Sequence, residues 1–182
     1  MAESARDRMV DSAIKFLATQ GFQGASFSSI LEDSNAPRGS IYHHFPGGKD
    51  ELILAAIDRS GRRAEQIVEG FRGRSAEGIV TSFVALWRSI LLMSDFRAGC
   101  SVLGATVSSG DDGIVDRAAD VFRSWQAALA DVIEAAGTPR EQAEDLGALL
   151  VASCEGAVVL CRAQRSTEPL DRVERSLLRA AA

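Results

Sequence analysis

The side chains best suited to chemistry lie between Ser26 and Lys49, in the stretch SFSSILEDSNAPRGSIYHHFPGGK. Arg38 can donate two hydrogen bonds to the edge of a guanine, or it can pair with a phosphate. Gly39 has no side chain, so the backbone can approach DNA closely there, and Ser40 can reach a base or a phosphate. These residue types suit contacts to DNA.

Other groups that can contact phosphates flank these three residues. Tyr42 and His43 follow on the same predicted helix and can donate to phosphates of the flanking strand. Lys49 stands at the start of the next helix, where its charge adds to the unpaired amides and the positive end of the helix dipole. The predicted DNA contacts are Ser26, Arg38, Gly39, Ser40, Tyr42, His43 and Lys49.

Three helices are predicted to position these side chains. The first runs from about Ser4 to Gln20 and is stopped by Gly21, and the second begins after the N-cap Ser26. Asn35 tolerates a positive φ and therefore suits the tight corner that follows. The third helix is predicted over Pro37–His44, with proline at its first position. This order of elements is that of a helix-turn-helix, which places one helix in the DNA major groove.

The same segment resembles the DNA-binding domain of the TetR family of bacterial transcriptional repressors. The matching stretches are Gly21-Phe22, Ser26-Phe27, Ile30, Arg38–Phe45 and Lys49–Leu52. Asn35 stands where the family usually has glycine. Pro37 replaces a small polar residue, which can change the base that the helix reads. The segment Phe96–Leu103 also resembles the LmrA/YxaF-like branch, which contains lincomycin-resistance regulators.

The resemblance implies more about assembly and regulation. Members of this family are homodimers whose last two helices pack into a four-helix interface. A small molecule in the C-terminal domain changes the separation of the two reading heads. The chain is therefore expected to be a ligand-responsive repressor whose dimer binds a near-palindromic operator, with heads ~34–36 Å apart or a multiple of that distance.

The whole chain is predicted to be all-α, with about nine helices. Residues 1–48 are expected to form the DNA-binding domain and residues 49–182 a ligand-binding and dimerisation domain, linked by a helix over 49–71. Further helices are expected over 76–94, with Ser75 as a candidate cap, and over 99–108, then up to 136, up to 164, and from 167 onward. The sequence Gly137-Thr138-Pro139-Arg140-Glu141 predicts a helix stop, then a cap at Thr138 and a capping box with Glu141.

Aromatic, methionine and small apolar side chains of the second domain form a candidate ligand pocket. For any single one of these residues, ordinary core packing is the alternative. The predicted pocket residues are Phe83, Trp87, Met93, Phe96, Cys100, Leu103, Val107, Trp125, Cys154 and Val158.

Small residues in the helix up to position 164 allow another helix to approach closely, and the last helix has an apolar face. Together they predict a dimer contact, with packing inside the chain as the alternative. The predicted contact residues are Gly147, Ala148, Ala152, Gly156, Leu170, Val173 and Leu177.

Composition limits the other classes of function. The net charge of -5 over 182 residues counts against nonspecific, charge-driven binding to nucleic acid. No apolar run approaches the ~18 residues of a membrane span, and the N-terminus has no apolar signal region, so we expect a cytoplasmic protein. Three spread cysteines do not form a disulfide framework, and their packing is favoured over a redox switch.

Enzymatic function is not expected, because the chain has no metal-ligand cluster, no phosphate-binding glycine motif and no nucleophile elbow. The adjacent His43 and His44 point in different directions on a helix, so a metal site is not favoured and no cofactor is expected. The remaining alternative is a helical protein-interaction module that keeps the fold without reading DNA.

Overall fold

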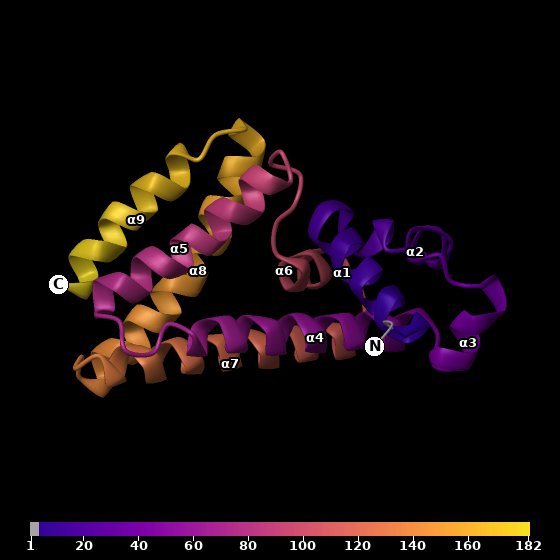
Figure 1. The fold of residues 1–182 in the computed structure, drawn as a ribbon, viewed down its shortest axis with the longest axis horizontal. Coiled ribbons are helices and arrows are strands. Elements are labelled where there is room, and N and C mark those ends of the chain that lie inside the picture. Colours follow the sequence, from indigo (N-terminus) through magenta and orange to yellow (C-terminus); the bar gives the residue numbers. More distant parts are fainter. Residues whose placement is uncertain (1–3) are drawn as a thin grey trace. The chain divides into compact units, whose positions relative to one another are not determined.

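The computed structural model describes residues 4–182, apart from the side chain of Arg38. Over this part of the chain it contains nine α-helices, one 3-10 helix and no strand, which confirms the all-α prediction (Figure 1). The elements are α1 (Ala5–Gly24), α2 (Phe27–Ser34), the 3-10 helix η1 (Arg38–Ser40), α3 (Ile41–His44), α4 (Lys49–Glu69), α5 (Ala76–Met93), α6 (Ser101–Ser108), α7 (Asp112–Ala135), α8 (Arg140–Gln164) and α9 (Glu168–Ala181).

The chain divides into two compact units. The first holds the described residues through Ser60 together with Cys100–Val121, and the second holds Gly61–Gly99 and Phe122–Ala182. This division differs from the one expected at residues 48 and 49. The difference arises because α6 and the first part of α7 pack with the N-terminal helices, although they are distant in sequence.

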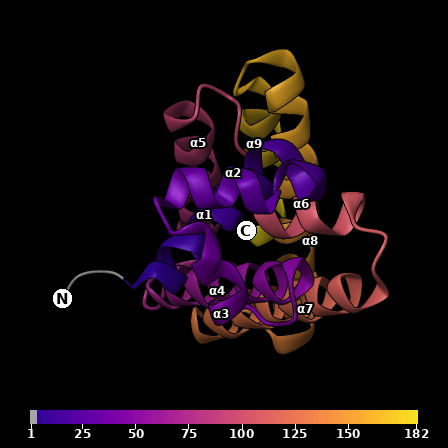
Figure 2. The ribbon, with the colours of Figure 1, turned by 90° about the vertical axis from the view of Figure 1, so that its right-hand side faces the viewer.

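Within the first unit, α6 lies against the C-terminal part of α1 (Figures 1 and 2). The two backbones meet at Gly104, where an added Cβ would stand 2.2 Å from the carbonyl oxygen of Leu17. One turn further along α6, the hydroxyl of Ser108 accepts a 2.9 Å hydrogen bond from the amide of Phe22. Only glycine permits this approach of the two helices.

Helices α5, α8 and α9 form the main bundle of the second unit. α5 buries one face at helical spacing, and α9 adds the buried Leu170 and Leu177. Arg88 of α5 holds α9 in place, because its guanidinium lies 2.8 Å from a carboxylate oxygen of Asp171 and 2.7 Å from one of Glu174. The buried α5 residues are Ala76, Ile79, Val80, Phe83, Val84, Trp87 and Leu91.

Helix ends were predicted with mixed success. Ser75 caps α5 as its side chain accepts a 3.2 Å hydrogen bond from the amide of Gly78, and Gly137 follows α7 with φ of 103°. The predicted capping box at the start of α8 is wrong. Pro139 occupies the cap position with ψ of 142°, the helix begins at Arg140, and no side chain caps it. The extended ψ of the proline moves the start of the helix one residue later than the sequence pattern indicated.

Two helices, α5 and α8, are long and apolar enough to cross a membrane if length and composition alone are considered. The sequence prediction that no apolar run approaches this length did not anticipate these two helices. Both helices have a buried face, and the two faces pack within the same bundle. They are the core helices of the second unit.

All three cysteines are free and buried. The sulfur of Cys100 accepts a 3.3 Å hydrogen bond from the amide of Leu103 at the start of α6. Burial raises the pKa of the Cys154 thiol to about 12, and burial also raises the pKa of Cys161. A raised pKa suppresses the reactive thiolate, so these features agree with packing rather than redox switching.

We expect the Cys154 thiol to resist alkylation in the folded chain. Its pKa rises from 9.0 to about 12, so its thiolate at pH 8 is ~1000-fold rarer than in the unfolded chain. Iodoacetamide labelling followed by peptide mass analysis should therefore modify Cys154 at least ~100-fold faster in 8 M urea than in buffer. Equal labelling rates in the two conditions would contradict the buried position.

Candidate functional site

Ion pairs fix the helices of the N-terminal unit in place. Arg59 of α4 pairs with Asp7 and Asp11 of α1, and Lys15 of α1 pairs with Asp33 of α2. These cations are therefore held by acids of the same unit. Arg59 and Lys15 therefore connect helices of this unit to one another.

The corner after α2 has the geometry that the sequence predicted. Asn35 adopts the left-handed conformation with φ of 51°, and the side chain of Arg8 donates a 3.0 Å hydrogen bond to the carbonyl of Ser34. The sequence predicted Pro37 as the first residue of a helix. This prediction is wrong, because the ψ of Pro37 is 135°, which is extended. The expected single helix over 37–44 is instead the 3-10 turn η1 followed by the short helix α3.

The buried residues Ile41 and Phe45 seat α3, and they leave its other side open. Tyr42 is 65% exposed, and its ring meets the edge of Phe27 with centroids 5.7 Å apart. This aromatic contact orients Tyr42 without burying it. Tyr42 is therefore a surface residue and not part of the core.

The other predicted reading residues lie on or beside this open surface. Gly39 is exposed, and an added Cβ would meet no atom within 4 Å. The hydroxyl of Ser40 donates a 2.7 Å hydrogen bond to the carbonyl of Pro37, and His43 is exposed. Arg38 begins η1, but its side chain lies outside the described part of the structure.

Ser26 caps α2, as predicted, because its hydroxyl accepts a 3.1 Å hydrogen bond from the amide of Ser29. The two hydroxyls also lie 2.8 Å apart. The position of Ser26 in the fold is therefore explained by capping. Any contact of Ser26 to a phosphate would add to that structural role.

Lys49 makes contacts inside the unit that the sequence did not indicate. Its ammonium donates a 2.8 Å hydrogen bond to the carbonyl of Phe22 and lies 3.8 Å from the centroid of the Phe22 ring. Burial lowers the pKa of Lys49. The carboxylate of Glu51 accepts a 2.7 Å hydrogen bond from the amide of Gly47. A negatively charged side chain therefore already lies at the positive, N-terminal end of α4.

Arg6 is a candidate contact that the site prediction omitted. It is exposed near the start of α1, and its guanidinium lies 5.0 Å from the centroid of the Phe45 ring, at the end of α3. Its proximity to α3 arises from tertiary packing. One sequence signal could have identified Arg6. It is a cation in the first turn of the helix that precedes the helix-turn-helix.

Across the described residues, no group of three or more histidine, cysteine, aspartate or glutamate side chains is placed to hold a metal ion. The rings of His43 and His44 stand edge to face, with centroids 5.2 Å apart.

The predicted pocket residues fall in both units. Cys100, Leu103 and Val107 belong to the first unit, and the other members belong to the second. Val107 is 72% exposed and Met93 is 89% exposed, so each is a surface residue. The members that remain as candidates in the second unit are Phe83, Trp87, Phe96, Trp125, Cys154 and Val158, of which Phe96 is half-buried and the others are buried.

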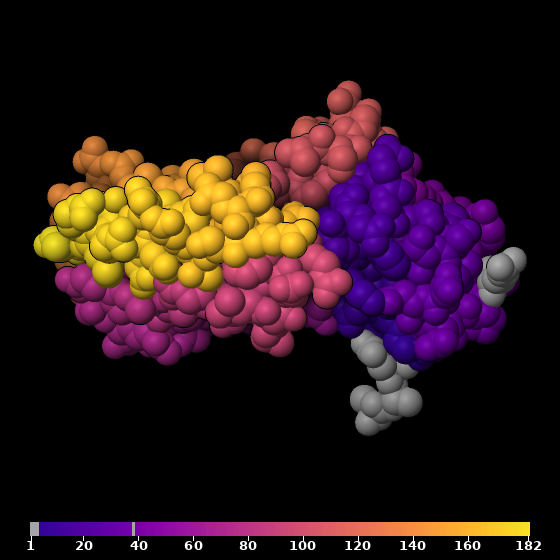
Figure 3. Space-filling view, turned by 90° about the horizontal axis from the view of Figure 1, so that it is seen from above, coloured from indigo at the N-terminus to yellow at the C-terminus, as the bar shows by residue number. Residues whose placement is uncertain are grey.

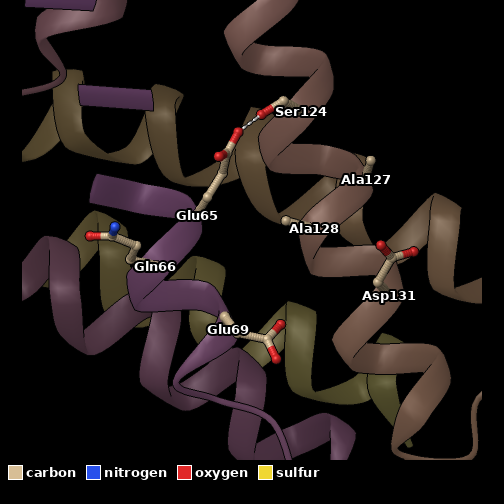
Figure 4. Close-up of a pocket in the computed structure, with 7 residues that line it drawn as sticks. All are labelled: Glu65, Gln66, Glu69, Ser124, Ala127, Ala128 and Asp131. Atoms are coloured by element: carbon tan, nitrogen blue, oxygen red, sulfur yellow. Dashed lines mark hydrogen bonds between the residues drawn. The ribbon is translucent and has the colours of Figure 1, made fainter. Parts of the chain in front are cut away.

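A surface groove lies elsewhere in the second unit, between α4 and α7 (Figure 4). Its volume is about 470 Å³, and the hydroxyl of Ser124 donates to Glu65 across it. Two of its other acids are paired, Glu69 with Arg72 and Asp131 with Arg140. No predicted pocket residue lines this groove. Its lining residues are Glu65, Gln66, Glu69, Ser124, Ala127, Ala128 and Asp131.

The predicted dimer residues separate into two groups. Leu170 and Leu177 are buried in their own bundle, and a Cβ at Gly147 would stand 2.8 Å from the carbonyl oxygen of Gln126 on α7. These three residues pack within the chain, which was the alternative interpretation. Ala152 and Gly156 are exposed, and Ala148 and Val173 are half-buried.

The exposed members belong to an apolar stripe along α8. It consists of Leu149, Ala152, Ser153, Gly156, Val159, Leu160 and Ala163, and it contains no charged side chain. Leu149, Val159 and Leu160 are 45%, 49% and 51% exposed. Figure 3 shows α9 and the C-terminal end of α8 on one open face of the second unit.

A capped helix, a left-handed corner and a following helix with an exposed aromatic donor define a helix-turn-helix DNA-binding protein. The family model of bacterial regulatory proteins of the tetR family matches residues 9–56. The model of the C-terminal domain of LmrA/YxaF-like transcriptional regulators matches residues 76–176. The chain belongs to the TetR family of bacterial transcriptional regulators, in its LmrA/YxaF-like branch.

Individual relatives agree with this assignment. The HTH-type transcriptional regulator Rv0196 of Mycobacterium tuberculosis is 36% identical over 182 residues, which cover 94% of this chain and 91% of the relative. YxaF of Bacillus subtilis is 26% identical over 169 residues, which cover 91% and 88%.

Solved structures share the fold. The regulatory protein TetR from Rhodobacter sphaeroides superposes with a TM-score of 0.85 at 21% identity and covers 97% of this chain and 98% of its own. A cysteine mutant of the TetR-family regulator CifR, complexed with a 26 bp double-strand operator DNA, gives a TM-score of 0.68 at 21% identity, with coverage of 98% and 97%.

Proposed function

We propose that this regulator is a homodimeric repressor that leaves its operator when a small apolar or amphipathic molecule binds the second unit. The single observation that carries the DNA-reading part is the exposure of Tyr42 on a helix whose neighbours Ile41 and Phe45 are fully buried. A side chain held rigidly on an open surface can meet a duplex without first being released from the core.

The reading surface combines base and phosphate contacts. Arg38 and Ser40 reach base edges or phosphates, and the open space around Gly39 lets the backbone approach the groove. Tyr42, His43 and Ser26 donate to phosphates on either side. Arg6, beside Phe45, adds a cation at the end of α3.

Dimerisation uses the apolar stripe of α8 with the half-buried Val173 of α9. An uncharged, exposed stripe along a helix favours pairing with a second helix. The exposed Ala152 and Gly156 allow the partner helix to approach closely, and Leu149 and Leu160 supply apolar area on either side of them. The two-fold symmetry of such a pair matches a near-palindromic operator.

Release requires only a modest preference of the effector for one arrangement of the heads. A coupling of about 1–3 kcal/mol between effector and DNA binding is typical of allosteric proteins. The buried side chains of the second unit that support an apolar site include Phe83, Trp87 and Trp125.

A mobility shift with the DNA that flanks the gene of this regulator tests the proposal. Arg38→Ala should weaken binding to the shifted fragment about tenfold and relax discrimination at one base pair, because a bidentate arginine contact is worth ~1–3 kcal/mol. A scan of single base-pair changes would locate that position. Wild-type affinity and discrimination in the variant would remove Arg38 from the reading surface.

Lys49→Ala separates the two roles that this lysine can have. If its ammonium meets a phosphate, binding weakens alike on all sequences and the slope of log K against log salt falls by about one. We expect this result, since the contact to the Phe22 carbonyl uses only one of three N–H donors. A weaker complex with an unchanged slope would restrict Lys49 to its contact with Phe22.

An arginine at position 152 should prevent dimerisation. Ala152 is an exposed member of the uncharged stripe, so Ala152→Arg would bury an unpaired charge at the proposed contact. Sedimentation at micromolar concentration should show a dimer for the wild type and a monomer for the variant. Ala127→Arg, at an exposed alanine of α7, is the matched control and should remain a dimer. A dimeric Ala152→Arg protein would place the contact elsewhere.

A further inference from the structure

The two tryptophans are equally buried but differ in hydrogen bonding. Trp87 and Trp125 are each 6% exposed. The indole N–H of Trp125 donates a 3.2 Å hydrogen bond to the carbonyl of Gly61. The indole nitrogen of Trp87 is fully shielded from solvent, and no acceptor among the described residues lies within hydrogen-bond distance of it.

A buried N–H without an acceptor is costly, and buried tryptophans usually find a partner for this group. Trp87 lies on the buried face of α5, four residues after Phe83, and the two rings meet edge to face with centroids 6.4 Å apart. The ring of Trp87 therefore packs against Phe83 on this face, and its N–H has no acceptor among the described residues.

We infer that the N–H of Trp87 is the hydrogen-bond donor that receives an acceptor oxygen of the effector. This inference rests on the proposed effector-released function and adds the chemical class of the effector. The class is a neutral, largely aromatic or aliphatic molecule with one carbonyl or ether oxygen. The apolar body packs against residues such as Phe83, and the oxygen satisfies the indole.

The charges of the bundle argue against an anionic effector. An indole N–H is neutral, so it cannot compensate the desolvation of a buried carboxylate or phosphate. Glu155 of α8 is itself only 9% exposed, and α8 packs against α5. The guanidinium of Arg88, the next residue after Trp87, is already paired with Asp171 and Glu174. A neutral acceptor avoids bringing a further negative charge into this bundle.

Matched pairs of aromatic ketone and hydrocarbon test the inference on the full chain. The probes are acetophenone with ethylbenzene, and 2-acetylnaphthalene with 2-ethylnaphthalene, which differ mainly in the carbonyl group. Binding is followed by titration while the two indole N–H resonances are recorded in 1H–15N spectra. The variants Trp87→Phe and Trp125→Phe assign the two resonances, since each removes one of them.

The expected result has three parts. In the free chain, the Trp87 indole proton resonates at lower frequency than that of Trp125, because only the latter is hydrogen-bonded. A ketone moves the Trp87 resonance to higher frequency, and its hydrocarbon partner does not. At least one ketone binds about tenfold more tightly than its hydrocarbon. Trp87→Phe removes this preference, whereas Trp125→Phe keeps it. Either variant can lose affinity for both probes through its smaller ring without changing this comparison.

Several outcomes would overturn the inference. They are a Trp87 proton that is already hydrogen-bonded in the free chain, a ketone preference that persists in Trp87→Phe, and failure of both ketones to bind. The operator shift is measured without any probe, so a regulator that binds DNA normally can still fail this test. Conversely, a chain that shows the Trp87 response but binds no operator would contradict the proposed repressor and leave the donor assignment standing.

Discussion

Gly104→Ala should lower the free energy of unfolding of the regulator by about 2–3 kcal/mol, although alanine is the better helix former. The new Cβ would stand 2.2 Å from the carbonyl oxygen of Leu17, a separation that no relaxed structure tolerates. The obstacle is backbone, not the flexible end of a side chain. Helix α6 must therefore move away from α1, and the Phe22–Ser108 hydrogen bond is lost with the contact.

Gly110→Ala is the matched control, because it lies in the same unit just after α6 and an added Cβ there meets no atom within 4 Å. This change should be neutral, or stabilising by up to ~1 kcal/mol through the unfolded chain. Urea unfolding of both variants at one protein concentration gives the comparison. Equal stability of the two variants would show that α1 and α6 do not meet as described.

The same substitution should affect DNA binding. Phe22, at the end of α1, accepts the hydrogen bond from Lys49 through its carbonyl and donates its amide to Ser108. Displacement of α6 therefore disturbs the residue that links α1 to the start of α4. We expect Gly104→Ala to weaken operator binding more than Gly110→Ala does, even at temperatures where both variants are folded.

The sequence could predict the features that depend on neighbouring residues. The corner at Asn35, the caps Ser26 and Ser75 and the stop at Gly137 were all predicted correctly. Each is determined by backbone preferences and hydrogen bonds that span four residues or fewer. Pro139 shows the precision of such signals, because the helix began one residue after the position that the pattern favoured.

Contacts between distant elements could not be predicted in the same way. Gly104 is one of several glycines in the sequence, and nothing near it indicates that it faces the carbonyl of Leu17. Lys49 was recognised as a cation at a helix start, yet its hydrogen bond to Phe22 depends on how α1 and α4 meet. Such positions are set by tertiary packing.

The spacing of apolar residues along a helix also does not show which of them are buried in the core of the chain. Met93 was assigned to a pocket and is 89% exposed, whereas Leu170 was assigned to a surface contact and is fully buried. Both residues lie on helices with a strong apolar face. Whether an apolar residue faces its own bundle or a partner depends on the neighbouring helices, which the spacing of one helix does not specify.

The two tryptophans give the second large effect, which requires no ligand. Trp125→Phe leaves the carbonyl of Gly61 without its buried donor, while Trp87→Phe removes a donor that has no acceptor among the described residues. Both changes remove the same ring volume from sites that are each 6% exposed. The difference between the two variants therefore isolates the hydrogen bond, and Trp125→Phe should be less stable than Trp87→Phe by about 1–3 kcal/mol.

Urea unfolding of the two variants, at equal protein concentration and followed by circular dichroism, measures this difference. If Trp87→Phe loses as much stability as Trp125→Phe, the indole of Trp87 has a hydrogen-bond partner in the free chain. This result would disprove both the predicted stability difference and the role of the Trp87 N–H as a donor to an effector oxygen. If the gap appears, the second unit keeps an unfavourable buried donor in the absence of ligand. A molecule that supplies an acceptor to this donor would then gain affinity, because the free chain already bears the cost of the unpaired N–H.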